Sequence, residues 1–336
     1  MLIRTYRKQL LGIAILGIFC VHSNEWVWNI EYLFLEHILS EGSIGVEIFL
    51  LLSGIGLFFS YNNSRNLLDF YFRRIKRIFP SYFLIAGIGY GILVFGQGDK
   101  NIISFLYLFS TIAFWKDGIG TVWFISFIIL MYALYPLIYR ICKCINKGGG
   151  WGITLLMLVS FTGVFVWADI CPEIYQNIEV AIARIPIFLL GCMIPFVEDK
   201  IEISAIKCAT ISFFLFVLFR VLRIAFISDD DILCEMVIRV SNIFFAILII
   251  EICCFLLQLC RSTIIHRILS WLGDRTLELY LCHMFLAGVY RGTSIGQRYQ
   301  SVIIYFLIIL PAAIIVADLI HRRILGAILC RKRNTN

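Results

Sequence analysis

Charged residues are scarce in this chain. Only 15% of its 336 residues are Asp, Glu, Lys or Arg, whereas 61% belong to the apolar set. A soluble domain needs about a quarter of its residues charged to cover its surface, so an ordinary soluble enzyme is excluded. Apolar runs long enough to cross a bilayer of about 30 Å instead recur from end to end. The composition therefore predicts an all-α, polytopic membrane helical bundle.

The chain also lacks the cysteine spacings of metal and redox sites. Most of its twelve cysteines fall inside apolar runs, and neither Cys142-x-Cys144 nor Cys253-Cys254 has zinc-site or redox spacing. We expect packing residues and no metal. No small-residue cleavage site follows the first apolar run, which predicts an uncleaved first helix. With no soluble domain, linker or repeat visible, we expect one membrane domain over 1–325 and a basic cytoplasmic tail at 326–336.

The apolar runs predict ten transmembrane helices, at roughly 9–24, 43–61, 79–96, 121–139, 151–168, 180–197, 205–227, 237–259, 270–289 and 301–320. The segment 101–116 is short and polar for a span, so it is expected to be re-entrant or interfacial. Nineteen Lys and Arg lie in the loops on the side of the termini, against four in the opposite loops. By the positive-inside rule, both termini are expected to be cytoplasmic, in the cell (inner) membrane. The net charge of +7 reflects this orientation, so no nucleic-acid partner is expected.

The densest charge is basic and lies between the second and third spans. Arg65 and the run Arg73-Arg74-Ile75-Lys76-Arg77 end against Pro80, in a loop expected at 62–78. Such a cluster marks a cytoplasmic loop of a membrane protein. It is denser than orientation requires, and guanidinium groups bind phosphate well. The cluster therefore predicts a site for a phosphate-bearing substrate as well as a topology.

Ionisable residues inside the spans are costly and usually mark function. His22 and His283 each lie about thirteen residues into helices that run in the same direction, so their depths match. Glu47 and Arg184 enter their spans from the outer side, where Trp123 also begins a span. One intramembrane histidine can simply make a packing hydrogen bond. Four ionisable groups at one depth instead favour a common site.

Histidine is the usual general base at neutral pH, and a carboxylate beside it fixes its tautomer. Glu47 is the expected partner of His22, and Arg184 is expected to hold a carbonyl, carboxylate or phosphate of the substrate. A hydroxyl deprotonated by His22 could then attack an activated acyl group. Nearer the start of the ninth span, Arg275 and Glu278 are spaced to pair with each other.

Six blocks of the sequence, in order, resemble the acyltransferase-3 family of membrane acyltransferases. They are Gly12 to Ser23, Gly45-Val-Glu47 to Ser53-Gly54, Tyr71 to Pro80, Val122-Trp123-Phe124-Ile-Ser126, Arg184 to Gly191, and Leu279-Tyr280-Leu-Cys-His283. The resemblance implies ten spans and transfer of an acyl group, commonly acetyl from acetyl-CoA, to a hydroxyl of a glycan or related cell-surface molecule. It also implies that His22 is the essential histidine and that Arg74 and Arg77 are the arginine pair, with Arg73 adjacent.

The chain departs from the family pattern at Leu11, where the family usually has a basic residue. Arg7 and Lys8 precede Leu11 by four and three residues, so on a helix they face roughly the same way and either could substitute. The expected site residues are thus, in order, catalytic His22 and Glu47; donor-binding Arg73, Arg74, Arg77 and Lys8; and substrate-binding Arg184, Trp123, His283 and Tyr280. The expected partners are acyl-CoA, a glycan or lipid-linked sugar, and membrane lipids.

The sequence is also compatible with two other classes of function. A bundle with intramembrane His, Glu and Arg could be a proton-coupled transporter or a flippase of a polysaccharide precursor, although no internal duplication or paired broken helices are visible. A non-catalytic membrane partner in polysaccharide assembly is the third reading, and it would tolerate His22→Ala. Whether His22 acts as a base or becomes transiently acylated is not determined by the sequence.

Overall fold

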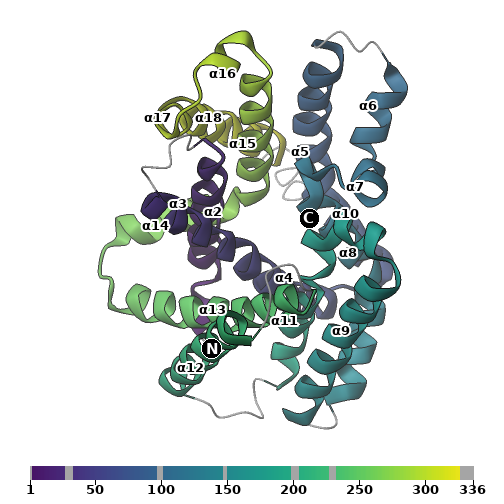
Figure 1. Cartoon of the computed structure of the whole chain (residues 1–336), viewed down its shortest axis with the longest axis vertical. Helices are drawn as coiled ribbons and strands as arrows, with labels where there is room; N and C mark the ends of the chain where they lie inside the picture. The colour runs from purple at the N-terminus through teal and green to yellow at the C-terminus, as the bar shows by residue number, and fades with distance from the viewer. Residues whose placement is uncertain are drawn as a thin grey trace.

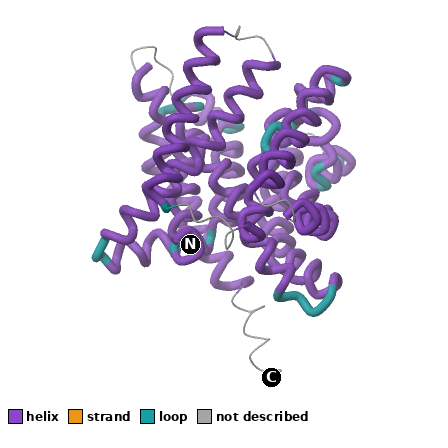
Figure 2. The backbone as a smooth tube through the Cα atoms, turned by 90° about the horizontal axis from the view of Figure 1, so that it is seen from below, coloured by secondary structure: helices purple, strands orange, loops and turns teal. Residues whose placement is uncertain are grey.

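The computed structural model describes residues 2–26, 33–96, 101–146, 150–197, 204–226 and 232–325. The regular structure in these ranges is helical throughout, and no strand is drawn in them (Figure 2). The elements are α1 Leu2–Thr5, α2 Arg7–Asn24, α3 Leu33–Ser40, η2 Glu41–Ser43, α4 Ile44–Asn62, α5 Leu67–Gly96, α6 Ile102–Phe109, α7 Ile112–Asp117, η3 Gly120–Val122, α8 Trp123–Ile145, α9 Gly150–Ile170, α10 Pro172–Ile182, α11 Ile185–Val197, α12 Ala205–Phe226, α13 Ile232–Leu259, α14 Thr263–Asp274, α15 Thr276–Arg291, α16 Ser294–Arg298, α17 Val302–Ile304, η5 Tyr305–Ile309, α18 Leu310–Ile320 and η6 His321–Leu325. The basic tail predicted at 326–336 lies outside the described residues.

Eight segments in the described ranges are long and apolar enough to cross a membrane. They are Phe34–Asn62, Leu67–Gly96, Gly120–Ile145, Trp151–Ile170, Pro172–Val197, Ala205–Ala225, Ile232–Leu259 and Val302–Arg323. The two other predicted spans correspond to α2, of 18 residues, and α15, of 16 residues, which carry His22 and His283. The predicted helical polytopic membrane bundle is confirmed.

Two predicted loops are helical instead. The basic cluster lies on the first turns of α5, which begins at Leu67 and continues through Pro80 for 30 residues, so the loop predicted at 62–78 is wrong. Long basic side chains can reach the aqueous interface from a helix, so a run of charge does not require a loop. Likewise, α14 replaces most of the loop predicted at 260–269, starting where the Ser262 side chain accepts a hydrogen bond from the backbone of Ile265.

Two further segments contain breaks, namely 101–116, which is expected to be re-entrant or interfacial, and the span predicted at 180–197. The segment 101–116 forms two short helices, α6 and α7, separated at Thr111, whose φ is 66°. At 1.5 Å per residue, α6 is about 12 Å long, which is too short to cross a bilayer. The span predicted at 180–197 breaks at Arg184, between α10 and α11. Pro186 lies in the first turn of α11 and has no backbone N–H, so it cannot bond to the carbonyl of Ile182, the last residue of α10.

Figure 1 shows α2 and α4 through the middle of the bundle, with α5 to α10 on one side and α12 to α16 on the other. Close approach between the helices depends on glycine. A Cβ at Gly12 of α2 would lie 2.1 Å from the carbonyl oxygen of Leu269 on α14, and one at Gly191 of α11 would lie 2.2 Å from that of Leu51 on α4. Small residues of this kind let membrane helices pack backbone to backbone.

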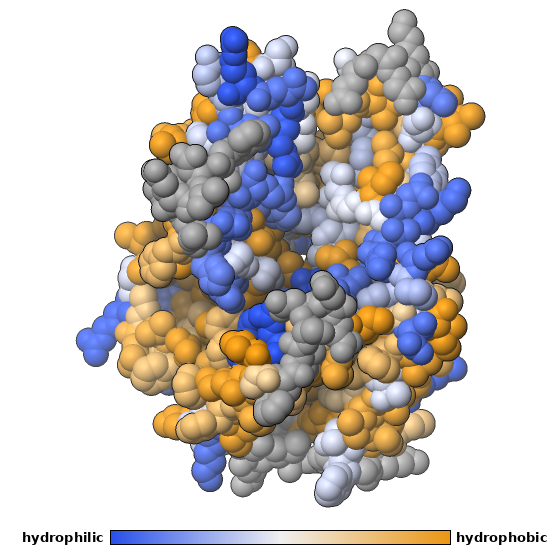
Figure 3. All heavy atoms as spheres, in the orientation of Figure 1, coloured by the Kyte–Doolittle hydropathy of each residue, from blue (hydrophilic) through white to orange (hydrophobic). Residues whose placement is uncertain are grey.

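The surface and the interior are both largely apolar, as a lipid environment requires. Figure 3 shows apolar side chains over the lower and outer parts of one face, and hydrophilic side chains concentrated toward its centre. Large apolar side chains are exposed along α9 and α12, among them Leu158, Phe214 and Ile224. The large apolar side chains exposed on α9 and α12 are suited to contact lipid.

Candidate active site

One cavity joins the basic cluster to the first histidine. It has a volume of about 540 Å³ and is lined by residues of α2, α4, α5, α8, α14 and α15. Its basic lining residues are Arg7, Lys8, Arg73, Arg74, Lys76 and Arg77. His22, Trp123 and Tyr280 line it as well, together with apolar side chains that include Leu11, Ile18, Phe49 and Phe124. This volume is within the usual range for a small-molecule site.

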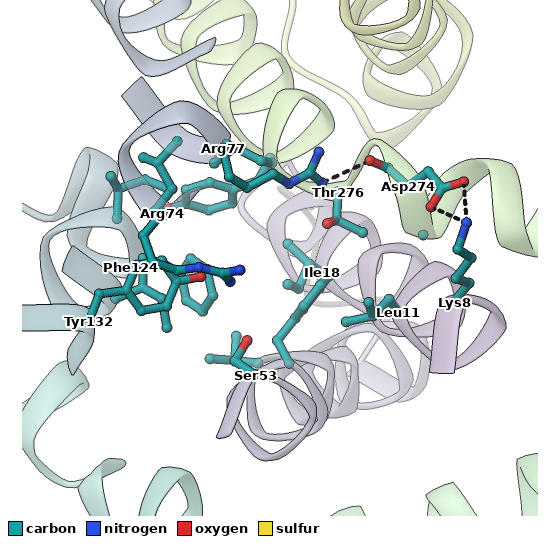
Figure 4. Close-up of a pocket in the computed structure, with 18 of the residues that line it drawn as sticks. Lys8, Leu11, Ile18, Ser53, Arg74, Arg77, Phe124, Tyr132, Asp274 and Thr276 are labelled. Atoms are coloured by element: carbon teal, nitrogen blue, oxygen red, sulfur yellow. Dashed lines mark hydrogen bonds and ion pairs between the residues drawn. The ribbon is translucent and has the colours of Figure 1, made fainter. Parts of the chain in front are cut away.

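The arginines of α5 are held at the wall of this cavity. Arg77 donates to the backbone carbonyl of Asp274 at 2.9 Å, and Arg74 donates to the Ser60 hydroxyl at 2.6 Å. Figure 4 shows Arg74 and Arg77 extending from one side of the cavity toward the side formed by Leu11 and Ile18. The Nε atom of Arg74 is buried and has no hydrogen-bond partner among the described residues. A buried donor of this kind is costly unless a ligand or water satisfies it.

Arg73 contributes differently. It pairs with Asp69 one turn earlier and donates to the backbone carbonyl of Asn63 at 2.7 Å. It therefore lines the cavity while its charge is partly neutralised. Within the described residues, Arg74 and Arg77 bond to a hydroxyl and a backbone carbonyl and form no ion pair with a carboxylate, so their charges are more available to an anion than that of Arg73.

Two basic residues lie near Leu11, where the family usually has a basic residue. Leu11 is buried and lines the cavity, and Arg7 and Lys8 line the same cavity one turn away. Arg7 donates to the backbone carbonyl of Leu52 at 3.2 and 3.3 Å, whereas Lys8 forms an ion pair with Asp274. Both basic residues are thus placed as the helical spacing predicted.

His22 has a carboxylate partner, but it is not Glu47. The Nδ1 atom of His22 lies 3.1 Å from Oε1 of Glu25, one turn further along the chain, and Oε2 of Glu25 lies 2.5 Å from Arg291 at the end of α15. The expected pair of His22 with Glu47 is wrong. With Nδ1–H donating to Glu25, the proton-free Nε2 of a neutral His22 is left to act as a base.

Glu25 itself follows the last residue of α2, at the edge of the bundle. The hydrogen bond from His22 and then that from Arg291 lower the pKa of Glu25 from its ordinary 4.5 to about 2, against the opposing effect of partial burial. The carboxylate therefore carries its charge throughout the physiological pH range. A charged partner of this kind both orients an imidazole and stabilises the imidazolium.

His283 lies beside His22, as their matched depths predicted. The two ring centroids are 5.3 Å apart, and the side chain of His283 is fully buried. Its Nδ1–H donates to the carbonyl of Leu279 at 2.9 Å, which leaves a lone pair on Nε2, and no described residue is hydrogen-bonded to that atom. His283 does not line the cavity, whereas its neighbour Tyr280 does. The role of His283 in substrate binding stays a prediction.

Glu47 belongs to a separate buried network. Glu47 is 3% exposed and accepts a hydrogen bond from Arg184, which is 7% exposed, at 3.0 Å; Arg239 of α13 lies 3.8 Å from the same oxygen and also pairs with Glu179. Buried charges are retained only when paired in this way. Because Arg184 is engaged by Glu47 and does not line the cavity, the geometry does not place it to hold a substrate.

The network reaches the cavity through Trp123. The Arg184 guanidinium lies 5.3 Å from the centroid of the Trp123 ring, within the range of a cation–π contact, and Trp123 lines the cavity. Arg184 and Glu47 thus support the wall of the site from behind.

Near the start of α15 the predicted pair is also wrong. Arg275 pairs with Asp318 at 2.8 Å, and Glu278 is fully buried and accepts a hydrogen bond from Ser81 at 2.7 Å. Helical spacing allowed a pair within α15, but both partners come from other helices.

Sequence reasoning missed Glu25, Arg291 and Asp274. The signal for Glu25 was its spacing of three residues from His22, which on a helix places the two side chains on the same face. Arg291 and Asp274 gave no comparable signal, because each contacts a residue 266 positions away.

A family model described as an acyltransferase domain matches residues 10–322, nearly the whole chain. The chain belongs to the acyltransferase-3 family. It is accordingly a membrane acyltransferase and an integral membrane protein. Neither a curated protein nor a solved structure matches the chain.

Proposed function

We propose that this member of the acyltransferase-3 family transfers an acetyl group from acetyl-CoA to a hydroxyl of a cell-surface glycan or lipid-linked saccharide. The observation that carries the proposal is the single cavity lined both by six basic side chains and by His22. A phosphorylated donor needs cations at one end of its site and a base at its reactive end, and this cavity supplies both.

The charge and the apolar lining of the cavity suit an acyl-CoA. Arg74 and Arg77 are placed to bind phosphate oxygens, and the unpartnered Nε of Arg74 offers a further buried donor. Apolar residues including Ile18 and Phe124 line the way toward His22 and suit an uncharged pantetheine arm. Donor entry from the cytoplasm, acceptor entry from outside, and cytoplasmic termini in the inner membrane belong to this proposal, in line with the distribution of Lys and Arg.

Glu25 holds His22 with its Nε2 free to accept a proton. In the proposed reaction, His22 takes the proton of the acceptor hydroxyl as that oxygen attacks the thioester carbonyl carbon. The carbon–oxygen bond forms, the carbon–sulfur bond breaks, and the proton passes from His22 to the leaving thiolate. This balances as general acid–base catalysis, with Glu25 stabilising the imidazolium between the two proton transfers.

The test supplies radiolabelled acetyl-CoA and host surface-glycan extract to membranes that contain the wild type or His22→Ala. We expect label in the glycan with the wild type alone. Equal labelling by both would make His22 structural and refute its role as the base. Labelling by neither would refute the proposed donor or acceptor. Substrate flux without consumption of acyl-CoA would instead support the transporter.

A further inference from the structure

The acid Asp274 lies at the strongly basic end of the cavity. Among the described residues that line the cavity, six are basic, and Asp274 is the one carboxylate. A carboxylate repels phosphate, so its presence weakens the binding of an anionic ligand. Asp274 therefore needs an explanation that the proposed reaction does not provide.

The contacts of Asp274 join it to two of those cations. Its two carboxylate oxygens lie 2.9 and 3.1 Å from Nζ of Lys8, and its backbone carbonyl accepts a hydrogen bond from Arg77 at 2.9 Å. Figure 4 shows the three residues at one end of the cavity, with both interactions drawn. Asp274 thus holds Lys8 through its side chain while presenting only a neutral carbonyl to Arg77.

The backbones at this point cannot separate easily. A Cβ at Gly273 would lie 1.9 Å from the carbonyl oxygen of Lys8, so the end of α14 is in direct contact with the start of α2. The side chains are freer, because those of Lys8 and Asp274 are 62% and 41% exposed. The ion pair can therefore open by rotation of side chains without movement of the helices.

We propose that Asp274 competes with a phosphate group of the acyl-CoA donor for Lys8, and so sets the affinity of the donor site. This inference rests on the proposed acyl-CoA donor. A phosphate carries more charge than one carboxylate and can contact several neighbouring cations at once, so a multiply phosphorylated donor displaces Asp274. A ligand with a single negative charge interacts too weakly with these cations to displace Asp274 from Lys8. Asp274 would thereby also select for donors with several phosphates.

Asp274→Asn tests this, because the amide keeps the shape of the side chain and removes its charge. We expect the Kd for CoA to fall by roughly three- to tenfold, the size appropriate to removing one like charge from a partly exposed anion site. Lys8→Gln should raise the Kd. In a Lys8→Gln background, Asp274→Asn should have a much smaller effect, because the two side chains act through each other.

The measurement is equilibrium binding of CoA, which cannot react, to the purified full-length protein in lipid nanodiscs. Asp169→Asn, an exposed acid on α9 away from the cavity, is the matched control and should leave the Kd unchanged. An unchanged or higher Kd in Asp274→Asn, with the same Tm as the wild type, would overturn the inference. If Asp274→Asn lowered the Kd for CoA equally in the wild type and in Lys8→Gln, the inference would also be overturned. Absence of CoA binding by the wild type would instead overturn the proposed donor.

Discussion

The pairing of His22 with Glu25 predicts that Glu25→Gln impairs turnover and spares donor binding. The variant removes the charge that orients Nδ1–H of His22 across 3.1 Å. A hydrogen bond to a charged group contributes about 1.5–3 kcal/mol. Because the Glu25 side chain is 43% exposed, we reduce this to roughly 1–2 kcal/mol. At about 1.4 kcal/mol per tenfold change in rate, kcat should fall about five- to thirtyfold.

The assay compares kcat for acetyl transfer with the Kd for CoA in the wild type, Glu25→Gln and Glu47→Gln. Glu47→Gln serves as the contrast, because it leaves the buried guanidinium of Arg184 without its carboxylate partner. Loss of one partner of a buried pair costs about 3–5 kcal/mol, so this variant should lower Tm sharply. A wild-type kcat in Glu25→Gln would refute the role of Glu25. A Glu47→Gln variant with the wild-type Tm and a lower kcat would also refute the role of Glu25, because Glu47 would then be acting as the partner of His22.

Three further predictions follow from the same contacts. Arg74→Ala/Arg77→Ala should weaken CoA binding at least tenfold, because charge-assisted hydrogen bonds to the phosphates are lost. The control variant Arg140→Ala/Lys143→Ala, which changes two exposed residues, should leave the Kd for CoA unchanged. Equal Kd values for the two double variants would contradict the assignment of Arg74 and Arg77 to donor binding. Gly191→Ala should destabilise the protein by about 2 kcal/mol, because the new Cβ would lie 2.2 Å from the carbonyl oxygen of Leu51. In Gly163→Ala the new Cβ would meet no atom within 4 Å, so the Tm of this control should be unchanged or higher. Since the pKa of Glu25 is lowered in the folded protein, its stabilising contribution should be complete above about pH 4.5 and vanish as the pH falls toward 2; a difference in Tm between wild type and Glu25→Gln that grows on acidification would refute this.

The sequence predicted the class of fold, and seven of its ten expected site residues line the cavity. Apolar run length located the spans, and helical spacing placed Arg7 and Lys8 near the positions they occupy. Charge was a poorer guide to helix ends, because the basic residues predicted to lie in loops are on the helical backbone of α5 and α14. Partner choice was the main failure. Glu47 lies in the first turn of α4 and Glu25 lies just after the end of α2, and only the packing of α4 against α11 brings Glu47 to Arg184.

The two ion pairs of α2 divide the site into halves that can be tested separately. Lys8 pairs with Asp274 just before α15 and Glu25 pairs with Arg291 at its end, so α2 and α15 run in the same direction, whereas α14 packs on α2 in the opposite direction. The 17 residues between Lys8 and Glu25 correspond to about 25 Å along α2. Sites this far apart without shared partners usually contribute additively.

Asp274→Asn/Glu25→Gln should therefore combine the tighter CoA binding of the first change with the lower kcat of the second. Each effect should keep the size that it has in the single variant, within about 0.5 kcal/mol. The Kd for CoA tests the half of the site that contains Lys8 and Asp274. The kcat with acetyl-CoA tests the half that contains His22 and Glu25. A Kd change that disappears in the Glu25→Gln background would show that α2 transmits donor binding to His22, and the division into independent halves would then be wrong.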